Sequence, residues 1–288
     1  MIAPALSVRS IGADEIDASA QFLHDTLNPR VSAAAWRSLF HPPWQAHAPN
    51  SGFVLLDAAG QPVGVYAAVY STRVIDGEPV PICNLAAFCV REDVRAHGLR
   101  LMRSLLGQKG FEFTDLSPSG NVVPMNERLG FRRLDTTTSL TLNLPGRRGG
   151  GIRTTEDHEA IERALDETDR RIHCDHREAP AARHLLVQRD GAYAYLVYRR
   201  DRRRRLPLFA SPLYVGGDRE LLREAWPAVR TRLLRHGLPF SLAEHRVLGF
   251  EPRWGVAVRH PRTKMIRGTR WRSDAVDYLY SELVLVNW

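Results

Sequence analysis

One glycine and three basic or hydrogen-bonding side chains lie together in the stretch Arg95-Ala96-His97-Gly98-Leu99-Arg100. The stretch follows an apolar segment at 80–90, which we expect to be a buried strand, and precedes an apolar stripe with helical spacing at 99–110. Free backbone N–H groups at the start of a helix bind phosphate oxygens. The sequence therefore predicts a phosphate-binding turn, to which Arg95, His97 and Arg100 add positive charge or hydrogen-bond donors.

The same residues have a structural alternative, in which Gly98 only closes a strand-to-helix turn. Arg100 also has two interpretations, because it belongs to the first turn of the expected helix. Its long side chain would crowd a phosphate in the turn, or it would lie over the phosphate and pair with it. The residues alone leave these alternatives open.

Hydrophobic periodicity and turn residues indicate the elements that position this stretch. In the first half we expect strands at 6–12, 52–57, 63–75, 80–90 and 111–117, helices at 14–27, 31–40, 99–110 and 121–130, and extended chain at 131–144. Asp76-Gly77 predicts a tight hairpin between two of these strands. Residues 145–151, rich in Gly and Arg, form the expected linker.

The second half repeats this order of elements. We expect a helix at 156–172, strands at 184–191, 192–201 and 205–215, a helix at 216–237 that Pro227 kinks or breaks, a strand at 238–250 and a last strand at 280–288. The recurrence indicates an internal duplication. We place the first domain at 1–146 and the second at 151–288.

This order of elements resembles the GNAT superfamily of acyl-CoA N-acyltransferases. The family's turn reads Gln/Arg-x-x-Gly-x-Gly/Ala, and residues 95–100 match it at the first and fourth positions but not at the sixth. The family has a later signature close to Tyr-Glu-Lys-Leu-Gly-Phe, and the matching residues here are Asn126-Glu127-Arg128-Leu129-Gly130-Phe131. Residues 245–250 are a degenerate second copy of this signature. The resemblance implies an α/β (α+β) fold of two GNAT-like domains, each a mixed, mostly antiparallel sheet flanked by helices.

The resemblance also implies that the first domain binds acetyl-CoA or another acyl-CoA as co-substrate. The pyrophosphate would lie on the turn made by Arg95, Ala96, His97, Gly98, Leu99 and Arg100. The thioester would lie near Cys89 and Val90, at the end of the strand before that turn. The turn of the second domain carries Asp218 and Glu220, whose carboxylates repel a pyrophosphate. We therefore expect the second domain to be a substrate platform or a structural partner.

Acyl transfer to an amine requires a base that removes a proton and an acid near the leaving thiolate. In the family a tyrosine often supplies the acid, and its position is taken here by Asn126. The alternative donors nearby are Ser117, Ser119 and Cys89. Asp115 and Glu127 are the candidate bases, and each has an alternative as a surface or capping residue.

The composition restricts the partners. No apolar run in the 288 residues reaches the roughly 18 residues that a membrane helix needs. The N-terminus lacks the pattern of a signal peptide. The three cysteines are too few and too scattered for a disulfide framework. We expect a cytoplasmic protein without membrane insertion. The formal net charge of +8 lies mostly in residues 151–288 and suits a small-molecule acceptor, particularly an anionic one, with nucleic acid as the alternative partner.

The sequence predicts no metal site, because no second cluster with ligand spacing accompanies His173-Cys174-Asp175-His176. The expected function is acyl-CoA-dependent acyl transfer, with an acetyl group passing to an amine of a small molecule or sugar by direct attack on the thioester. Two alternatives remain. One is a non-catalytic binding or scaffold protein of GNAT fold, and the other is a tandem-GNAT transferase that takes its group from aminoacyl-tRNA.

Overall fold

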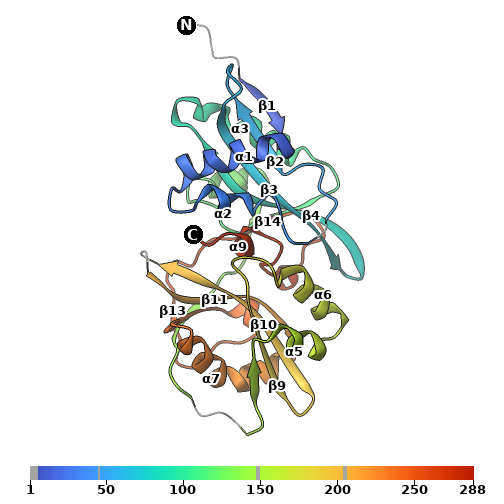
Figure 1. The fold of residues 1–288 in the computed structure, drawn as a ribbon, viewed down its shortest axis with the longest axis vertical. Coiled ribbons are helices and arrows are strands. Elements are labelled where there is room, and N and C mark those ends of the chain that lie inside the picture. Colours follow the sequence, from blue (N-terminus) through green and yellow to red (C-terminus); the bar gives the residue numbers. More distant parts are fainter. Residues whose placement is uncertain (1–5, 45, 147–149, 204–205) are drawn as a thin grey trace. The chain divides into compact units, whose positions relative to one another are not determined.

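The computed structural model describes residues 6–44, 46–146, 150–203 and 206–288 (Figure 1). The chain forms two compact units. The first unit runs to Leu134 and includes Thr263–Ala275 and Tyr280–Trp288, while the second unit consists of Asp135–Arg262 and Val276–Leu279. This division differs from the expected domains 1–146 and 151–288, and it has a cause in the pairing of the strands.

The first unit contains a seven-stranded, mostly antiparallel sheet in the order β1-β2-β3-β4-β5-β14-β6. Its strands are β1 (Ser7–Ser10), β2 (Gly52–Leu56), β3 (Pro62–Ile75), β4 (Glu78–Val90), β5 (Glu112–Asp115), β6 (Arg132–Arg133) and β14 (Met265–Arg267). Its helices are α1 (Ala13–Phe22), α2 (Ala33–Arg37), α3 (Gly98–Leu106), α4 (Val123–Arg128) and α9 (Glu282–Leu285), with further short helical segments at Leu23–Leu27, Glu92–His97 and Ser273–Ala275.

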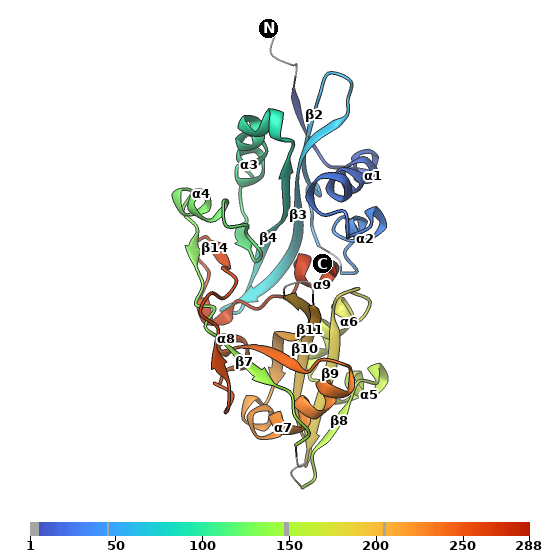
Figure 2. The same ribbon diagram turned by 90° about the vertical axis from the view of Figure 1, so that its left-hand side faces the viewer.

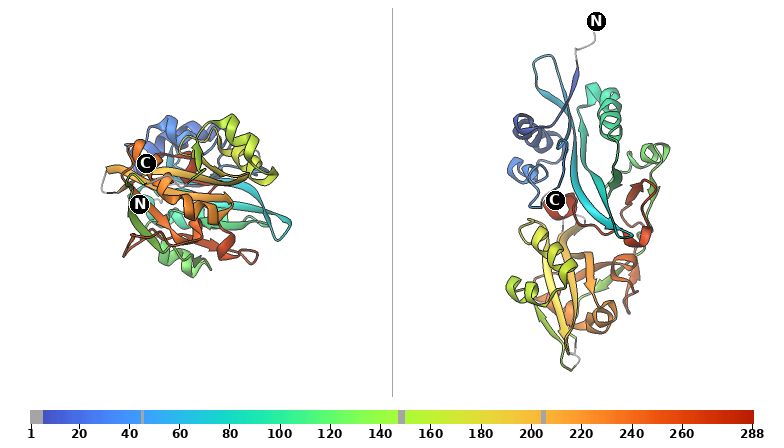
Figure 3. Two further views of the ribbon diagram at one scale, coloured as in Figure 1. Left: turned by 90° about the horizontal axis from the view of Figure 1, so that it is seen from below. Right: turned by 90° about the vertical axis from the view of Figure 1, so that its right-hand side faces the viewer.

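Helices cover both faces of this sheet. Helices α1 and α2 lie on one face and α3 lies on the other (Figures 2 and 3). The apolar stripe expected from Leu99, Met102, Leu105 and Leu106 is confirmed in part. Met102 and Leu105 are fully buried, but Leu99 is exposed, and Leu101 is buried in its place. Burial of this stripe holds the start of α3 against the end of β4.

The second unit contains another seven-stranded sheet, in the order β13-β7-β12-β11-β10-β9-β8, with α5 and α7 on opposite sides of it (Figure 2). Its strands are β7 (Thr138–Leu142), β8 (Arg153–Thr155), β9 (Arg183–Arg189), β10 (Ala192–Arg203), β11 (Leu206–Gly217), β12 (Phe240–Glu244) and β13 (Val256–Ala257). Its helices are α5 (His158–Ala164), α6 (Glu167–His176), α7 (Arg219–Arg235) and α8 (His245–Leu248). The predicted α/β fold with two mixed, mostly antiparallel sheets is thus confirmed.

The two halves of the sequence exchange one strand each. Strand β7 follows the first Leu-Gly-Phe but pairs with β12 and β13 in the second sheet. Strand β14 follows the second Leu-Gly-Phe but pairs with β5 and β6 in the first sheet. A boundary placed at the linker therefore assigns β7 and β14 to the wrong sheets. Part of that linker, 147–149, lies outside the described residues.

Four expected elements are wrong in part. The strand expected at 238–250 ends at Glu244, and His245–Leu248 form the helix α8. The helix expected at 156–172 is broken between α5 and α6, because Asp166 leaves the helical conformation and caps α6 by accepting from the Asp169 N–H at 2.8 Å. Helix α7 continues through Pro227, where we expected a kink or a break. The strand expected at 280–288 is the short helix α9, which Ser281 caps at its start.

The helices in the described part of the chain are all too short or too polar to cross a bilayer. This finding concerns the described helices alone.

Candidate active site

Strands β4 and β5 separate partway along β4. They pair in parallel only over 82–85 and 112–115, and β4 then continues to Val90. The register of β4 with β3 shifts by one residue here, so that Ala86 and Ala87 lie opposite Ala67 in a β-bulge. Among the described strands none pairs with this edge of β4 past Leu85. The edge therefore offers main-chain groups to an extended ligand.

The turn after β4 is ordered by packing. A 3-10 helical segment, Glu92–His97, which is kinked at Val94, runs directly into α3, and the Gly98 N–H donates to the Arg95 carbonyl. Gly98 has a right-handed φ of −58°, so it is not needed for a left-handed turn. A Cβ at this position would lie 3.0 Å from the ring of Phe88 and 3.2 Å from Val90. Gly98 therefore allows α3 to approach β4 closely, a packing role that differs from the turn closure considered as the structural alternative above.

Arg100 follows neither interpretation drawn from the sequence. Its Nη1 donates to the main-chain carbonyl of Leu6, just before β1, at 3.1 Å. Arg95 is exposed and forms a long ion pair with Glu92, at 3.6 Å. Ala96 and Leu99 are also exposed, and His97 is half-buried. The cationic groups of the predicted turn are thus accessible, but Arg100 is held at the edge of the sheet.

Asp115 ends β5 at the point where β4 and β5 separate, and its side chain is buried. Its Oδ2 accepts from Nδ2 of Asn126, on α4, at 2.7 Å. Burial raises the pKa of Asp115 to about 7, with a further rise from the charge of Glu282, while the hydrogen bonds from Asn126 and the Ser117 backbone oppose both. The sequence proposed Asp115 and Asn126 independently, and the structure brings them together.

Glu282 is a site residue that sequence reasoning missed. This fully buried residue begins α9, and its carboxylate accepts from Nδ2 of Asn84 and from the Ser117 hydroxyl, both at 2.5 Å. Asn84 is oriented by Thr114, whose hydroxyl donates to its Oδ1 at 2.8 Å. The signal in the sequence was weak, because a lone Glu in the apolar run at 280–288 reads as the exposed face of a strand.

The other predicted site residues are distributed more widely. Glu127 is not part of the buried group, since its carboxylate pairs with Arg133 at 2.7 Å on the exposed side of α4. Cys89 is half-buried on β4 past the bulge, and burial raises the pKa of its thiol. Val90 packs beside Gly98. Tyr66, opposite Phe88, was not predicted, and its buried hydroxyl has no hydrogen-bond partner among the described residues.

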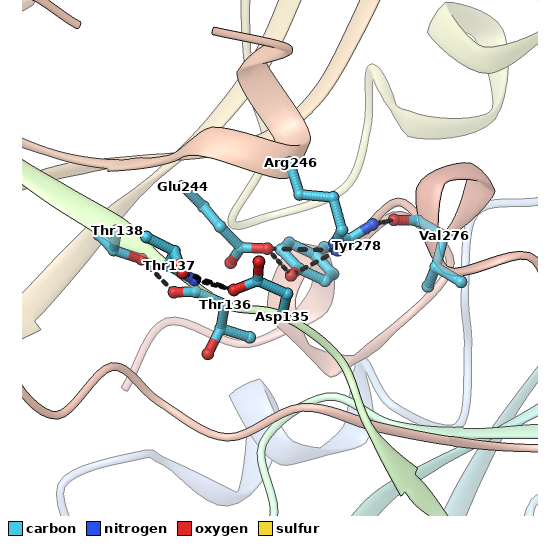
Figure 4. Close-up of polar contacts among 8 residues, drawn as sticks. All are labelled: Asp135, Thr136, Thr137, Thr138, Glu244, Arg246, Val276 and Tyr278. Atoms are coloured by element: carbon cyan, nitrogen blue, oxygen red, sulfur yellow. Dashed lines mark hydrogen bonds and ion pairs between the residues drawn. The ribbon is translucent and has the colours of Figure 1, made fainter. Parts of the chain in front are cut away.

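The second unit has the corresponding opening, and its own chain fills it. Strands β11 and β12 pair only at 209–210 and 240–241, and the register of β11 with β10 also shifts nearby. The Tyr278 N–H donates to the Leu213 carbonyl of β11 at 3.1 Å. Figure 4 shows the Tyr278 hydroxyl bonded to Glu244, at the end of β12, and to Arg246.

The start of α7 is also closed to an anion. Asp218 caps this helix, and its carboxylate accepts from the N–H groups of Glu220 and Leu221. Gly216 and Gly217 serve packing, because a Cβ at either position would overlap Asp169 or Tyr193. These contacts oppose a second acyl-CoA site at the start of α7, and they agree with the expectation that the second unit is a substrate platform or a structural partner.

The segment His173-Cys174-Asp175-His176 lies at the end of α6, and its histidines form hydrogen bonds to nearby residues. His173 Nε2 lies 2.9 Å from Nδ1 of His158, and His176 Nδ1 lies 2.8 Å from the Ile172 carbonyl. Within the described ranges, no three His, Cys, Asp or Glu side chains are grouped to hold a metal ion.

No protein-family model matches the sequence, and no curated protein matches it either. Solved structures do match. A probable N-acyltransferase of Enterococcus faecalis superimposes with a TM-score of 0.60 at 13% identity, over 94% of this chain and 74% of that chain. A second match is the GCN5-related glucosamine N-acetyltransferase region of a fungal multi-domain β-N-acetylglucosaminidase. It superimposes with a TM-score of 0.59 at 12% identity, over 92% of this chain but only 38% of that chain.

Saccharomyces cerevisiae N-myristoyltransferase with bound myristoyl-CoA gives a TM-score of 0.50 at 11% identity, over 100% of this chain and 85% of that chain. At such identities the likeness is one of fold. The chain has the fold of the GNAT superfamily, as the order of its elements predicted.

Proposed function

We propose that the protein is an acyl-CoA-dependent acyltransferase whose chemistry takes place in the first unit. The observation that carries the proposal is Asp115, a buried carboxyl with a pKa of about 7 at the point where β4 and β5 separate. The acceptor we propose is an amine of a small molecule or sugar, and acetyl is the acyl group that we propose first.

The residues present fit an acyl-CoA. The edge of β4 past the bulge, up to Cys89 and Val90, would pair with the amide groups of the pantetheine arm. The exposed side chain of Arg95 and the half-buried side chain of His97 would face the pyrophosphate at the start of α3. Arg100 would join them only by giving up its hydrogen bond to Leu6.

When bound, the acyl-CoA supplies a thioester carbonyl that an amine can attack directly. The ionised Asp115 carboxylate then accepts a proton from the attacking nitrogen, and its pKa of about 7 suits a base that works near neutral pH. Asn126 is a positioning residue in this scheme, because it holds Oδ2 of Asp115. Cys89, whose raised pKa keeps the thiol protonated, is the proposed proton donor toward the leaving thiolate.

The first experiment is calorimetric titration of the full chain with acetyl-CoA, CoA and longer acyl-CoAs, followed by turnover on a panel of amines. We expect saturable binding, and a loss of turnover of about 100-fold or more in Asp115→Asn with acyl-CoA affinity retained. Asp25→Asn, an exposed carboxyl on the helical turn after α1, is the matched control and should leave both unchanged. Absence of heat from every acyl-CoA in folded protein would exclude the proposal.

A non-catalytic acyl-CoA-binding protein is the second candidate. Asn126 favours it, because the residue at the position of the family's tyrosine is fully buried and bonded to Asp115. Binding of CoA without turnover on any amine would support this candidate. RNA binding that weakens steeply with salt, together with indifference to CoA, would instead support transfer from aminoacyl-tRNA.

A further inference from the structure

A second group of ionisable side chains lies in the second unit, and the acyl-transfer proposal makes no use of it. A pocket of about 270 Å³ opens there between β9, β10 and the ends of α6 and α7. Three exposed guanidinium groups line it, from Arg177, Arg183 and Arg200, together with His158 and Tyr198. The sequence had indicated only that this half of the chain is basic.

Two of the guanidinium groups have no carboxylate partner among the described residues. Arg183 Nη1 donates to the Ala182 carbonyl at 2.8 Å, and Arg200 Nη2 donates to the His236 carbonyl at 2.9 Å. In the part of the chain that the structure describes, neither side chain forms an ion pair. Main-chain carbonyls orient these groups but do not neutralise them, so the pocket keeps their positive charge.

The remaining charges do not cancel this excess. Glu156, which also lines the pocket, is already paired with Arg232 at 3.0 Å and with His236 at 2.7 Å. Arg177 makes two long ion pairs, one of 3.8 Å with Glu162 and one of 4.0 Å with Glu178. The pocket is therefore an electropositive hollow of small size.

Buried polar groups complete the lining. Tyr198 is only 3% exposed, and its hydroxyl has no hydrogen-bond partner within the described residues. Burial raises the pKa of Tyr198 to about 12, so the hydroxyl stays protonated and can donate. His184 stays neutral, because burial lowers its pKa to about 3, and its two ring nitrogens lie against the Tyr195 hydroxyl and the His176 carbonyl.

We propose that this pocket binds a small molecule bearing a phosphate group. The two negative charges of a phosphate dianion balance the positive charges of Arg183 and Arg200. The phosphate oxygens can accept hydrogen bonds from both guanidinium groups and from the Tyr198 hydroxyl at the same time. The volume lies just below the roughly 300–1,000 Å³ of sites for drug-sized ligands, so the organic part of the ligand is small. This site is independent of acyl transfer in the first unit.

The test is calorimetric titration of the full chain with inorganic phosphate, glycerol phosphate and succinate at matched ionic strength. We expect glycerol phosphate to bind at one site. Arg200→Gln should weaken that binding by about tenfold or more, because a charged hydrogen-bonding partner is lost. Tyr198→Phe removes only the hydroxyl and should weaken the binding of glycerol phosphate about threefold or more. This variant still tests the proposal if Arg200→Gln fails to fold.

Arg171→Gln is the matched control, because Arg171 is an exposed residue of α6 that does not line the pocket. The Arg171→Gln variant should bind glycerol phosphate as tightly as the original protein does. Three results would overturn the proposal: no saturable binding of either phosphate compound, equal weakening in Arg171→Gln, or succinate binding as tightly as glycerol phosphate. If inorganic phosphate binds as tightly as glycerol phosphate, the result would support a site that recognises the phosphate group alone.

Discussion

Asp115 lies in an environment that favours its neutral form. Its side chain is buried, it forms no ion pair with a described cation, and the carboxylate of Glu282 acts on it through space. Asn126 and the Ser117 backbone counter these effects by donating hydrogen bonds, which favour the ionised form. The balance places the pKa of Asp115 at about 7, so small changes in its neighbours should move its titration across neutral pH.

Asn126→Leu should raise the pKa of Asp115. The substitution removes a hydrogen bond to the charged carboxylate, and such bonds contribute about 1.5–3 kcal/mol, or about one to two pH units. Carbon-detected NMR of the carboxyl groups measures the shift without depending on turnover. The acidic limb of any pH–rate profile should move to higher pH with it. Asn121→Ala, at an exposed position before α4, should leave the titration in place.

Glu282→Gln should shift the titration in the opposite direction. The charge of Glu282 disfavours the ionised form of Asp115, so its removal lowers the pKa of Asp115, by about one unit. Gln keeps an acceptor oxygen for the Asn84 amide, and its own amide N–H can donate to the Ser117 hydroxyl, so both contacts of α9 can be kept. The same NMR titration checks this, with Glu78→Gln in the exposed hairpin as control. A pKa that stays at its original value would show that Glu282 acts on Asp115 only structurally.

At the scale of the elements, the sequence predicted most of the first unit, because its strands alternate or end in strong turns. Asp76 and Gly77 have the positive φ angles that their hairpin requires. The errors arise where tertiary contacts override local preference. The Val- and Leu-rich run at 280–288 favours a strand, but the cap at Ser281 and complete burial of Glu282–Leu285 make it helical. Glu282 was missed for the same reason.

Gly98 has a packing role in the contact between α3 and β4, whether or not a ligand binds beside it. Gly98→Ala should destabilise the chain by about 1 kcal/mol, because the new methyl group would press on the Phe88 ring while the helix gains little. Urea unfolding measures the change, and Phe88→Leu in the same chain should recover part of it. Gly120→Ala, with open space around it, is the matched control. Equal stability of Gly98→Ala and the original protein would show that α3 does not require this close approach.

At the scale of the whole molecule, the two halves of the sequence exchange strands reciprocally. Each sheet takes one strand from the other half of the sequence, and the segment at 276–282 supplies Tyr278 to the second unit and Glu282 to the first. Sequence patterns could not show this, because a strand's own residues do not state which sheet it joins. The candidate site in the first unit therefore depends on the end of the chain as well as on its beginning.

Separate expression of the halves 1–146 and 151–288 tests this dependence. The first half lacks β14, whose Met265 is fully buried in the core of the first unit, and it lacks Glu282. Its strand β5, which carries Asp115, would become an unpaired edge. We expect each half alone to give no cooperative unfolding transition, and the two halves refolded together to recover the near-ultraviolet circular dichroism of the intact chain. A first half that unfolds cooperatively by itself would contradict the exchange, since its sheet would then be complete without β14.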